Sequence, residues 1–129
     1  MMADWIDICA EEEIAAGFAG TVPVAGGDDI AIFHTLGGEF YALVNKCPHK
    51  AGPLSQGIVH GDSVSCPLHN WRISLKSGEA LGSDEGCTPT IGLRREGGRV
   101  LLARADIAAV RDGAVEPHAN SPCPPVIGA

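Results

Sequence analysis

Two short stretches rich in metal-binding residue types constrain this chain more than any other feature. The first reads Cys47-Pro48-His49 and the second reads Cys66-Pro67-Leu68-His69, and residues 50–65 separate them. Each stretch supplies one thiol and one imidazole. A proline after each cysteine biases that cysteine toward extended backbone and fixes the next φ angle. We therefore expect two similar loops that leave strand ends stiffly and share one metal centre.

Two kinds of metal centre compete for such loops. Zinc is bound by two cysteines and two histidines in many structural sites, but the cysteines there usually come as a pair at C-x(2–4)-C spacing. Neither cysteine of these loops has another cysteine that close. A [2Fe–2S] cluster with two cysteines on one iron and two histidines on the other suits loops that each mix a thiolate with an imidazole. The residues favour the cluster and leave zinc as the alternative.

The stretches "CPHKAGPL" (47–54) and "CPLHNW" (66–71) resemble the Rieske iron–sulfur signature C-x-H-x(n)-C-x-x-H. The resemblance extends over roughly Trp5 to Ala103. It implies an all-β fold of three stacked antiparallel sheets, with the cluster on two loops at the tip of the smaller sheet. It also implies four cluster ligands, which are Cys47, His49, Cys66 and His69.

The pattern of short apolar runs between turn signals independently indicates an all-β chain. A first strand is predicted at Trp5–Cys9, followed by at most one helical turn in 10–17. Gly37-Gly38, Gly61-Asp62 and Gly97-Gly98 each separate two apolar runs, which predicts three hairpins. A further strand is predicted where "WRISLKSGEA" (71–80) begins, ending in a turn at Ser77-Gly78.

The length of 129 residues fits one domain with one modest core. The composition changes near Arg104, after which alanine and proline predominate. We therefore expect a Rieske-like domain over residues 1–104 and an Ala/Pro-rich tail over 105–129. Asp106 is expected to cap a short helix at Ile107–Arg111, and the chain beyond Glu116 is expected to be extended or disordered.

The net charge of −7 and the absence of a basic patch argue against a nucleic-acid partner. No run approaches the roughly 18 apolar residues of a membrane span, and the N-terminus has no signal-peptide pattern. We expect a soluble cytoplasmic protein without a membrane partner. In a reducing compartment the three remaining cysteines are expected to be buried or free thiols, and the three remaining histidines are not expected to be ligands. These residues are Cys9, Cys87, Cys123, His34, His60 and His118.

The implied cluster would make the chain a one-electron carrier. An oxidised Fe₂S₂ core with two thiolates and two neutral imidazoles is neutral overall, so it accepts an electron more readily than a cluster with four thiolates. All terminal positions on the irons would be filled by protein, so no catalytic site of its own is expected. In Rieske proteins of respiratory cytochrome complexes, two extra cysteines and a serine raise the potential; the matching places here hold Gly52, Leu68 and Trp71. The resemblance therefore predicts a potential at the low end of the Rieske range, about −150 mV or somewhat above.

The stretch 52–86, especially "HNW" (69–71) and "GEALGSDEGC" (78–87), is similar to the small subunit of assimilatory NAD(P)H-dependent nitrite reductase. That likeness implies an electron-transfer subunit beside a large subunit with flavin and sirohaem, which reduces nitrite to ammonium in nitrogen assimilation. No G-x-G-x-x-G nucleotide motif is present, so nicotinamide would bind elsewhere. The alternative is a free Rieske ferredoxin that supplies electrons to a ring-hydroxylating oxygenase. A zinc-stabilised interaction module is a third hypothesis.

Overall fold

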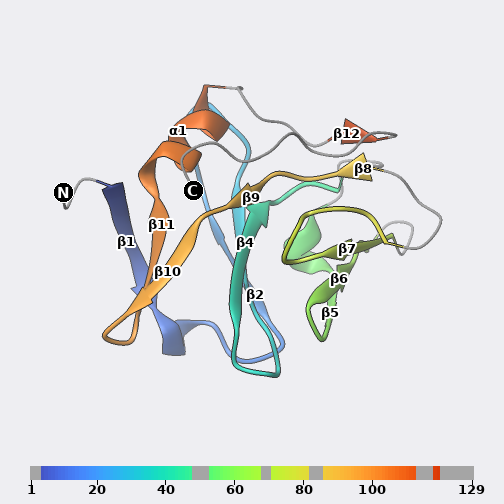
Figure 1. Ribbon diagram of the computed structural model, residues 1–129, viewed down its shortest axis with the longest axis horizontal. Coiled ribbons are helices and arrows are strands. Elements are labelled where there is room, and N and C mark those ends of the chain that lie inside the picture. The colour runs from blue at the N-terminus through green and yellow to red at the C-terminus, as the bar shows by residue number, and fades with distance from the viewer. Residues whose placement is uncertain (1–3, 48–52, 68–70, 82–85, 113–117, 120–129) are drawn as a thin grey trace.

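The computed structural model describes residues 4–47, 53–67, 71–81, 86–112 and 118–119 (Figure 1). Within these ranges short strands predominate, with one α-helix and two 3₁₀ helices. The strands are β1 (Trp5–Ala10), β2 (Ala19–Val22), β3 (Ile30–His34), β4 (Phe40–Val44), β5 (Ile58–His60), β6 (Ser63–Ser65), β7 (Arg72–Ser74), β8 (Gly86–Cys87), β9 (Thr90–Ile91), β10 (Leu93–Glu96), β11 (Arg99–Ala103) and β12 (His118–Ala119). The helices are η2 (Glu11–Glu13), η3 (Leu54–Gln56) and α1 (Arg104–Arg111).

Three antiparallel sheets form the body of the molecule, as predicted. Their strand orders are β1-β11-β10, β2-β3-β4-β9 and β5-β6-β7, and β8 and β12 make a separate pair. Figure 1 shows the four-stranded sheet in the middle, with β1, β10 and β11 on one side and β5–β7 on the other. The expected all-β architecture with three antiparallel sheets is therefore confirmed.

The side-chain alternation of β3 explains why this sheet lies in the middle. Successive residues of a strand point to opposite faces. Ile30 and Ile32 pack into a core shared with β11, whereas Ala31 and Phe33 pack into a second core shared with β6 and β7. All four are at most 1% exposed. A strand that is apolar on both faces is stable only between two other layers.

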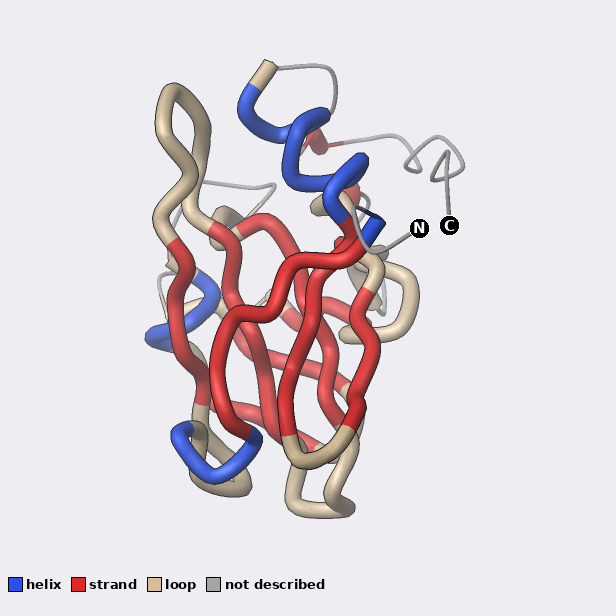
Figure 2. Tube along the Cα trace, turned by 90° about the vertical axis from the view of Figure 1, so that its left-hand side faces the viewer, coloured by secondary structure: helices blue, strands red, loops and turns tan. Residues whose placement is uncertain are grey.

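All three predicted hairpins are present. The β3–β4 hairpin turns at Gly37-Gly38, the β5–β6 hairpin at Gly61-Asp62 and the β10–β11 hairpin at Gly97-Gly98. In the first, Gly38 has a φ of 88°, a backbone conformation that glycine adopts without steric cost. Two of the turns lie at the end of the molecule opposite α1 (Figures 1 and 2): those of β3–β4 and β10–β11.

The helix near the C-terminus begins earlier than predicted. It runs from Arg104 to Arg111 with Ala103 at the N-cap, so Asp106 lies inside its first turn and is not the cap. The Asp106 carboxylate instead accepts a hydrogen bond from the Gly92 backbone N–H at 2.7 Å. Aspartate often caps helices, but the side chain of Asp106 is used for this contact with Gly92, so it lies within the first turn of α1. Further along, β12 pairs with β8, so residues 118–119 are extended as expected and also hydrogen-bonded in a sheet.

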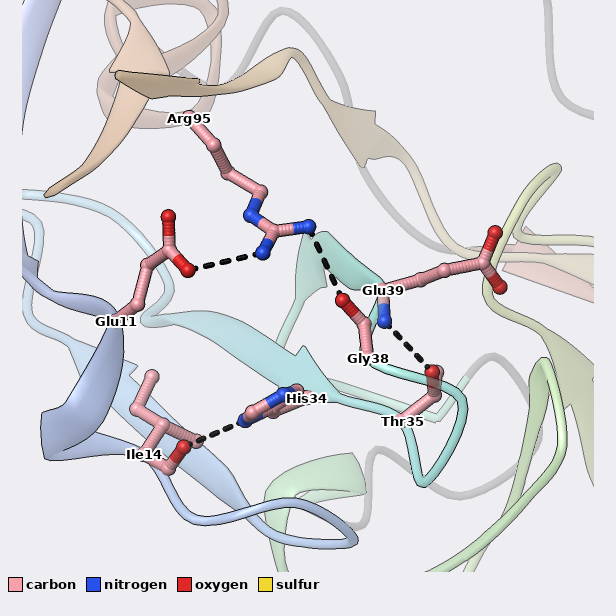
Figure 3. A network of polar contacts seen from close by, with 7 residues as sticks. All are labelled: Glu11, Ile14, His34, Thr35, Gly38, Glu39 and Arg95. Atoms are coloured by element: carbon pink, nitrogen blue, oxygen red, sulfur yellow. Dashed lines mark hydrogen bonds and ion pairs between the residues drawn. The ribbon is translucent and has the colours of Figure 1, made fainter. Parts of the chain in front are cut away.

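A polar network ties the β3–β4 turn to two other elements (Figure 3). Arg95 of β10 donates to the Gly38 carbonyl at 3.0 Å and to the Glu11 carboxylate at 2.9 Å. Its guanidinium lies 4.9 Å from the centre of the Phe40 ring, and the imidazole of His34 stacks on Phe40 at 4.1 Å. The network therefore holds η2, β10 and the hairpin turn together at the end of the fold where β4 begins.

Among the described residues, no helix is both long enough and apolar enough to cross a membrane.

Candidate functional site

Cys47 and Cys66 lie in one apolar cluster, together with residues of β3, β4, β6 and β7. Cys47 follows the end of β4 by three residues, and Cys66 directly follows β6. Both belong to the same cluster of buried residues, with Phe33, Leu54 and Ile73 among their neighbours. Cys47 is 2% exposed and Cys66 is 1% exposed. Two thiols from separate loops therefore share one apolar environment, as the two-loop hypothesis requires.

The other two predicted ligands, His49 and His69, lie outside the described residues, as do Gly52 and Leu68. The ligand set therefore stays a prediction after this description. What the structure adds is the placement of the two predicted thiol ligands and of the strand ends from which both loops start.

The first loop begins and ends at residues that are fixed by hydrogen bonds. The Asn45 backbone N–H donates to the Asp29 carbonyl at 2.8 Å. The Asn45 side-chain oxygen accepts from the Ser55 backbone N–H, also at 2.8 Å. Leu54, between Ser55 and the loop, is fully buried. The base of the loop is therefore anchored on both sides of Cys47.

The second loop is closed at its base by its own backbone. The Cys66 N–H donates to the Trp71 carbonyl at 2.7 Å. The Trp71 side chain packs, partly buried, against the same apolar cluster as the two cysteines. A backbone hydrogen bond and the packing of Trp71 therefore fix the base of this loop.

The donor set suits an iron–sulfur cluster. Two thiolates buried in an apolar cluster would be strongly disfavoured without a compensating positive charge. A metal centre supplies that charge, and it binds the thiolate form of cysteine. Neither Cys47 nor Cys66 is part of a disulfide.

The remaining described histidines have surroundings that do not resemble a ligand site. The ring of His34 donates from Nδ1 to the Ile14 carbonyl at 2.7 Å and stacks on Phe40, at the opposite end of β3 and β4 from Cys47. His60 is exposed at the end of β5. The interpretation of both as structural or surface residues fits these positions. For His118 the structure describes only its place in β12.

The other cysteines divide into two cases. Cys9 of β1 is a partly buried free thiol, and burial, followed by the nearby Glu13 carboxylate, raises its pKa. Cys87 is fully buried but disulfide-bonded, so the expectation of a thiol there is wrong. That expectation rested on a reducing compartment and on the lack of a nearby cysteine in sequence, and a lone cysteine in a sequence carries no signal of a distant partner. Cys123 lies outside the described residues.

Charged side chains near the loop bases are mostly exposed. Lys46, next to Cys47, pairs with Asp28 at 3.4 Å, and both side chains are about 40% exposed. Arg72, after the second loop, is exposed as well. Exposed pairs of this kind contribute little to stability.

Comparison with known families and proteins agrees with this site. The family model described as "Rieske [2Fe-2S] domain" matches residues 4–90. The ferredoxin component of the naphthalene 1,2-dioxygenase/salicylate 5-hydroxylase systems of Ralstonia sp. is 35% identical over 108 residues, which is 79% of this chain and 97% of that protein. The ferredoxin component of a 2,4-dinitrotoluene dioxygenase system from Burkholderia sp. is 32% identical with the same coverage.

Similar solved structures include an oxygenase-system ferredoxin and also a nitrite reductase small subunit. A ferredoxin in a complex with the oxygenase of carbazole 1,9a-dioxygenase matches with a TM-score of 0.71 at 25% identity, covering 78% of this chain and 94% of that chain. A nitrite reductase small subunit from Mycobacterium tuberculosis, described as NADH-dependent and not yet verified, matches with a TM-score of 0.69 at 26% identity and the same coverage.

These relatives adjust the sequence-based expectation at one point. The curated relatives named above belong to oxygenase systems, whereas a nitrite reductase small subunit is found among structural neighbours. The coarser expectation, an electron carrier of the ferredoxin type, is confirmed. The chain belongs to the Rieske [2Fe–2S] family, and its cofactor is a Rieske [2Fe–2S] cluster.

Proposed function

We propose that this protein is the ferredoxin component of an oxygenase system, which takes one electron from a reductase and passes it to the oxygenase. The observation that carries the proposal is the 35% identity to a dioxygenase ferredoxin over 97% of that protein's length. The match covers nearly the whole ferredoxin, so it concerns the complete carrier and not a shared fragment. This was the alternative function in the sequence analysis, and the relatives now favour it.

We also propose the cluster ligands. Cys47 and Cys66 would hold one iron and His49 and His69 the other, as in the Rieske arrangement. The described half of this set supports the proposal, since the two cysteines share one buried environment at the bases of two loops. A bound cluster of this kind supplies one-electron redox chemistry.

The chain's own residues contribute burial and rigidity to that chemistry. Both cysteines are almost fully buried, which excludes water from the sulfur side of the site. Hydrogen bonds at Asn45 and at Cys66 fix the loop bases, so little rearrangement is needed when the charge changes. Because the four proposed ligands fill the terminal positions, we expect no substrate-binding site on the metal and no catalysis by this chain alone.

A second candidate function is the small subunit of an NAD(P)H-dependent nitrite reductase. Two structural neighbours favour it, since their descriptions name that subunit and their identities, 26% and 28%, are at least as high as that of the carbazole dioxygenase ferredoxin. In that case a large flavin- and sirohaem-containing subunit would be the partner.

Affinity purification of the full chain from cells that make it separates the two functions. We expect a flavin-dependent reductase or an oxygenase to co-purify, and we expect NADH to reduce the carrier only when the reductase is present. Co-purification of a large chain with the absorption of sirohaem, together with nitrite-dependent oxidation of the reduced carrier, would overturn the proposal in favour of the second candidate.

The ligand set is tested on the purified protein. Pulsed EPR of the dithionite-reduced protein should show two strongly coupled histidine nitrogens, and Cys66→Ser should abolish the native signal. His60→Ala and Cys9→Ser are matched controls outside the proposed set and should keep the spectrum. A zinc-containing, colourless protein, or a normal cluster in Cys66→Ser, would show that the ligand set is wrong.

A further inference from the structure

The short helix η3, which follows the first ligand loop, is capped from a distance. The first N–H groups of any helix have no partner within the helix. Pro53, at the N-cap of η3, provides no side-chain hydrogen bond. The acceptor for the Ser55 N–H is instead the Asn45 side chain, 2.8 Å away and ten residues earlier in the chain.

This contact closes the first ligand loop. Residues 46–54 lie between its two ends, and they include Cys47 and His49. Without the Asn45 acceptor, the part-buried Ser55 N–H would lose its partner, which costs free energy beyond the lost bond itself. Fully buried Leu54 would still hold this side of the loop, but the hydrogen bond from its first end to η3 would be gone. Asn45 therefore fixes the separation between the two ends of the loop.

A second contact lies between the end of η3, just after the first loop, and the last residue of β6, just before the second loop. A Cβ atom on Gly57 would lie 2.1 Å from the Ser65 carbonyl oxygen and 3.1 Å from that of Leu54. Any side chain at position 57 would therefore push against the residue that directly precedes Cys66. The φ of Gly57 is −81°, which other residues also adopt, so lack of space and not backbone conformation requires glycine here.

We propose that Asn45 and Gly57 are positioning residues for the cluster. Asn45 sets the width of the loop that carries Cys47, and Gly57 sets the distance from that loop to Cys66. Neither residue belongs to the proposed ligand set. The inference rests on the proposed ligand set, because the spacing of the two loops matters only if both carry ligands of one cluster.

The decisive comparison is Asn45→Leu with Asn45→Asp. Leucine has a similar branched shape, is somewhat larger and has no acceptor, whereas a carboxylate still accepts from the Ser55 N–H. We expect the leucine variant to lose its cluster to a chelator about tenfold faster than wild type, the factor that about 1.4 kcal/mol corresponds to, and to show shifted g values. The aspartate variant should keep the wild-type loss rate and g values, while its added negative charge lowers the reduction potential.

Thr35→Val is the matched control. The Thr35 hydroxyl accepts from the Glu39 N–H at 3.0 Å in the β3–β4 turn, at the far end of β4 (Figure 3). Its loss should lower stability without changing the cluster-loss rate or the g values. Equal cluster-loss rates in Asn45→Leu and wild type would overturn the role of Asn45. If Asn45→Leu does not accumulate, Asn45→Ala removes the acceptor without added volume and is judged by the same criteria.

Gly57→Ala tests the second contact, with Gly37→Ala as its control. The nearest atom to a Cβ at Gly37 is 3.7 Å away, so alanine fits there. We expect altered g values and faster cluster loss for Gly57→Ala only. A wild-type spectrum in Gly57→Ala would overturn its role. These outcomes are distinct from a failure of the ligand set, which would appear as a native signal in Cys66→Ser.

Discussion

Asp106 is buried, with 5% of its surface exposed, although its side chain is ionisable. One carboxylate oxygen accepts from the Gly92 N–H, and this joins α1 to the connection between β9 and β10. There is little space around the pair, since a Cβ at Gly92 would lie 3.1 Å from that same oxygen. The residue therefore acts as a link between elements and not as the helix cap that its sequence position indicated.

Two replacements of Asp106 test its role as a hydrogen-bond acceptor, because one removes the acceptor oxygen and the other keeps it. Asp106→Leu leaves the Gly92 N–H without its partner and should lower the free energy of unfolding by about 1–3 kcal/mol. Asp106→Asn keeps an acceptor oxygen and should lose less. Urea denaturation of the holoprotein measures both, and equal losses in the two variants would contradict a role for the hydrogen bond.

The residues around the second loop also bear on the reduction potential. Hydrogen bonds to the cluster's sulfur atoms tune its potential, and Trp71 stands where the high-potential Rieske proteins place a serine. We predict a midpoint potential near the lower limit of the Rieske range, about −150 mV. An EPR-monitored redox titration measures it. A midpoint well above zero would show that another donor compensates for the missing hydroxyl.

At the scale of elements, Arg95 connects three parts of the fold that are distant in sequence. Its contacts reach the hairpin turn at Gly38, the η2 carboxylate of Glu11 and the ring of Phe40. The hydrogen bond from Arg95, and then the charges of Arg95 and His34, lower the pKa of Glu11. Arg95 and Glu11 are both at the surface, so each single contact contributes little to stability. The three contacts of the Arg95 guanidinium together connect the elements.

Arg95→Met should lower the melting temperature by a few degrees while the EPR spectrum stays native, because the network lies at the far end of β4 from Cys47. The pH dependence has a defined sign. Since the folded-state pKa of Glu11 is lowered, its contribution is present above the ordinary carboxyl pKa and is lost as the pH falls through the lowered value. The difference in melting temperature between variant and wild type should therefore shrink in acid. A constant difference would assign the effect to Phe40 packing.

The elements that could be predicted are those with a strong local pattern. The β3–β4 hairpin combines two apolar runs with a Gly-Gly turn, so its place and register follow from the sequence. In contrast, β2 contains Gly20 within only four residues, and β8 and β9 have two residues each. Such strands are defined by their pairing partners and not by their own periodicity. The start of α1 was missed because the Asp106 acceptor serves Gly92, a contact that no local pattern reveals.

For the candidate site, the sequence indicated the metal-binding residue types but not the contacts that hold their loops in place. The C-x-H and C-x-x-H spacing identified the two thiols that the fold brings together. The Asn45–Ser55 hydrogen bond and the Gly57 contact were not predictable, because each depends on how loops of unrelated sequence meet after folding. The disulfide at Cys87 had no local signal either.

At the scale of the whole molecule, the C-terminal segment extends past the region that the family model covers, which ends at residue 90. Part of this segment completes the core, since β11 supplies Val100 and Leu102 and α1 supplies Val110. β12 then pairs with β8, which is itself bridged to Glu79. Just after β8, the Thr88 hydroxyl donates to the Val44 carbonyl, three residues before Cys47. The C-terminal segment is thus connected, through β8, to the strand that leads into the first ligand loop.

The disulfide at Cys87 should stabilise this connection. Cys9, Cys47 and Cys66 are not in disulfides, so by count we predict Cys123 as the partner. A bridge that closes a loop of this length restricts the unfolded chain, and its removal should cost about 4 kcal/mol by the chain-entropy estimate. Cys87→Ser should therefore lower the melting temperature of the holoprotein clearly, whereas Cys9→Ser should leave it nearly unchanged. Peptide mapping without reductant checks the pairing. A map without the Cys87–Cys123 peptide, or a variant as stable as wild type, would show that strand pairing alone holds the C-terminal segment in place.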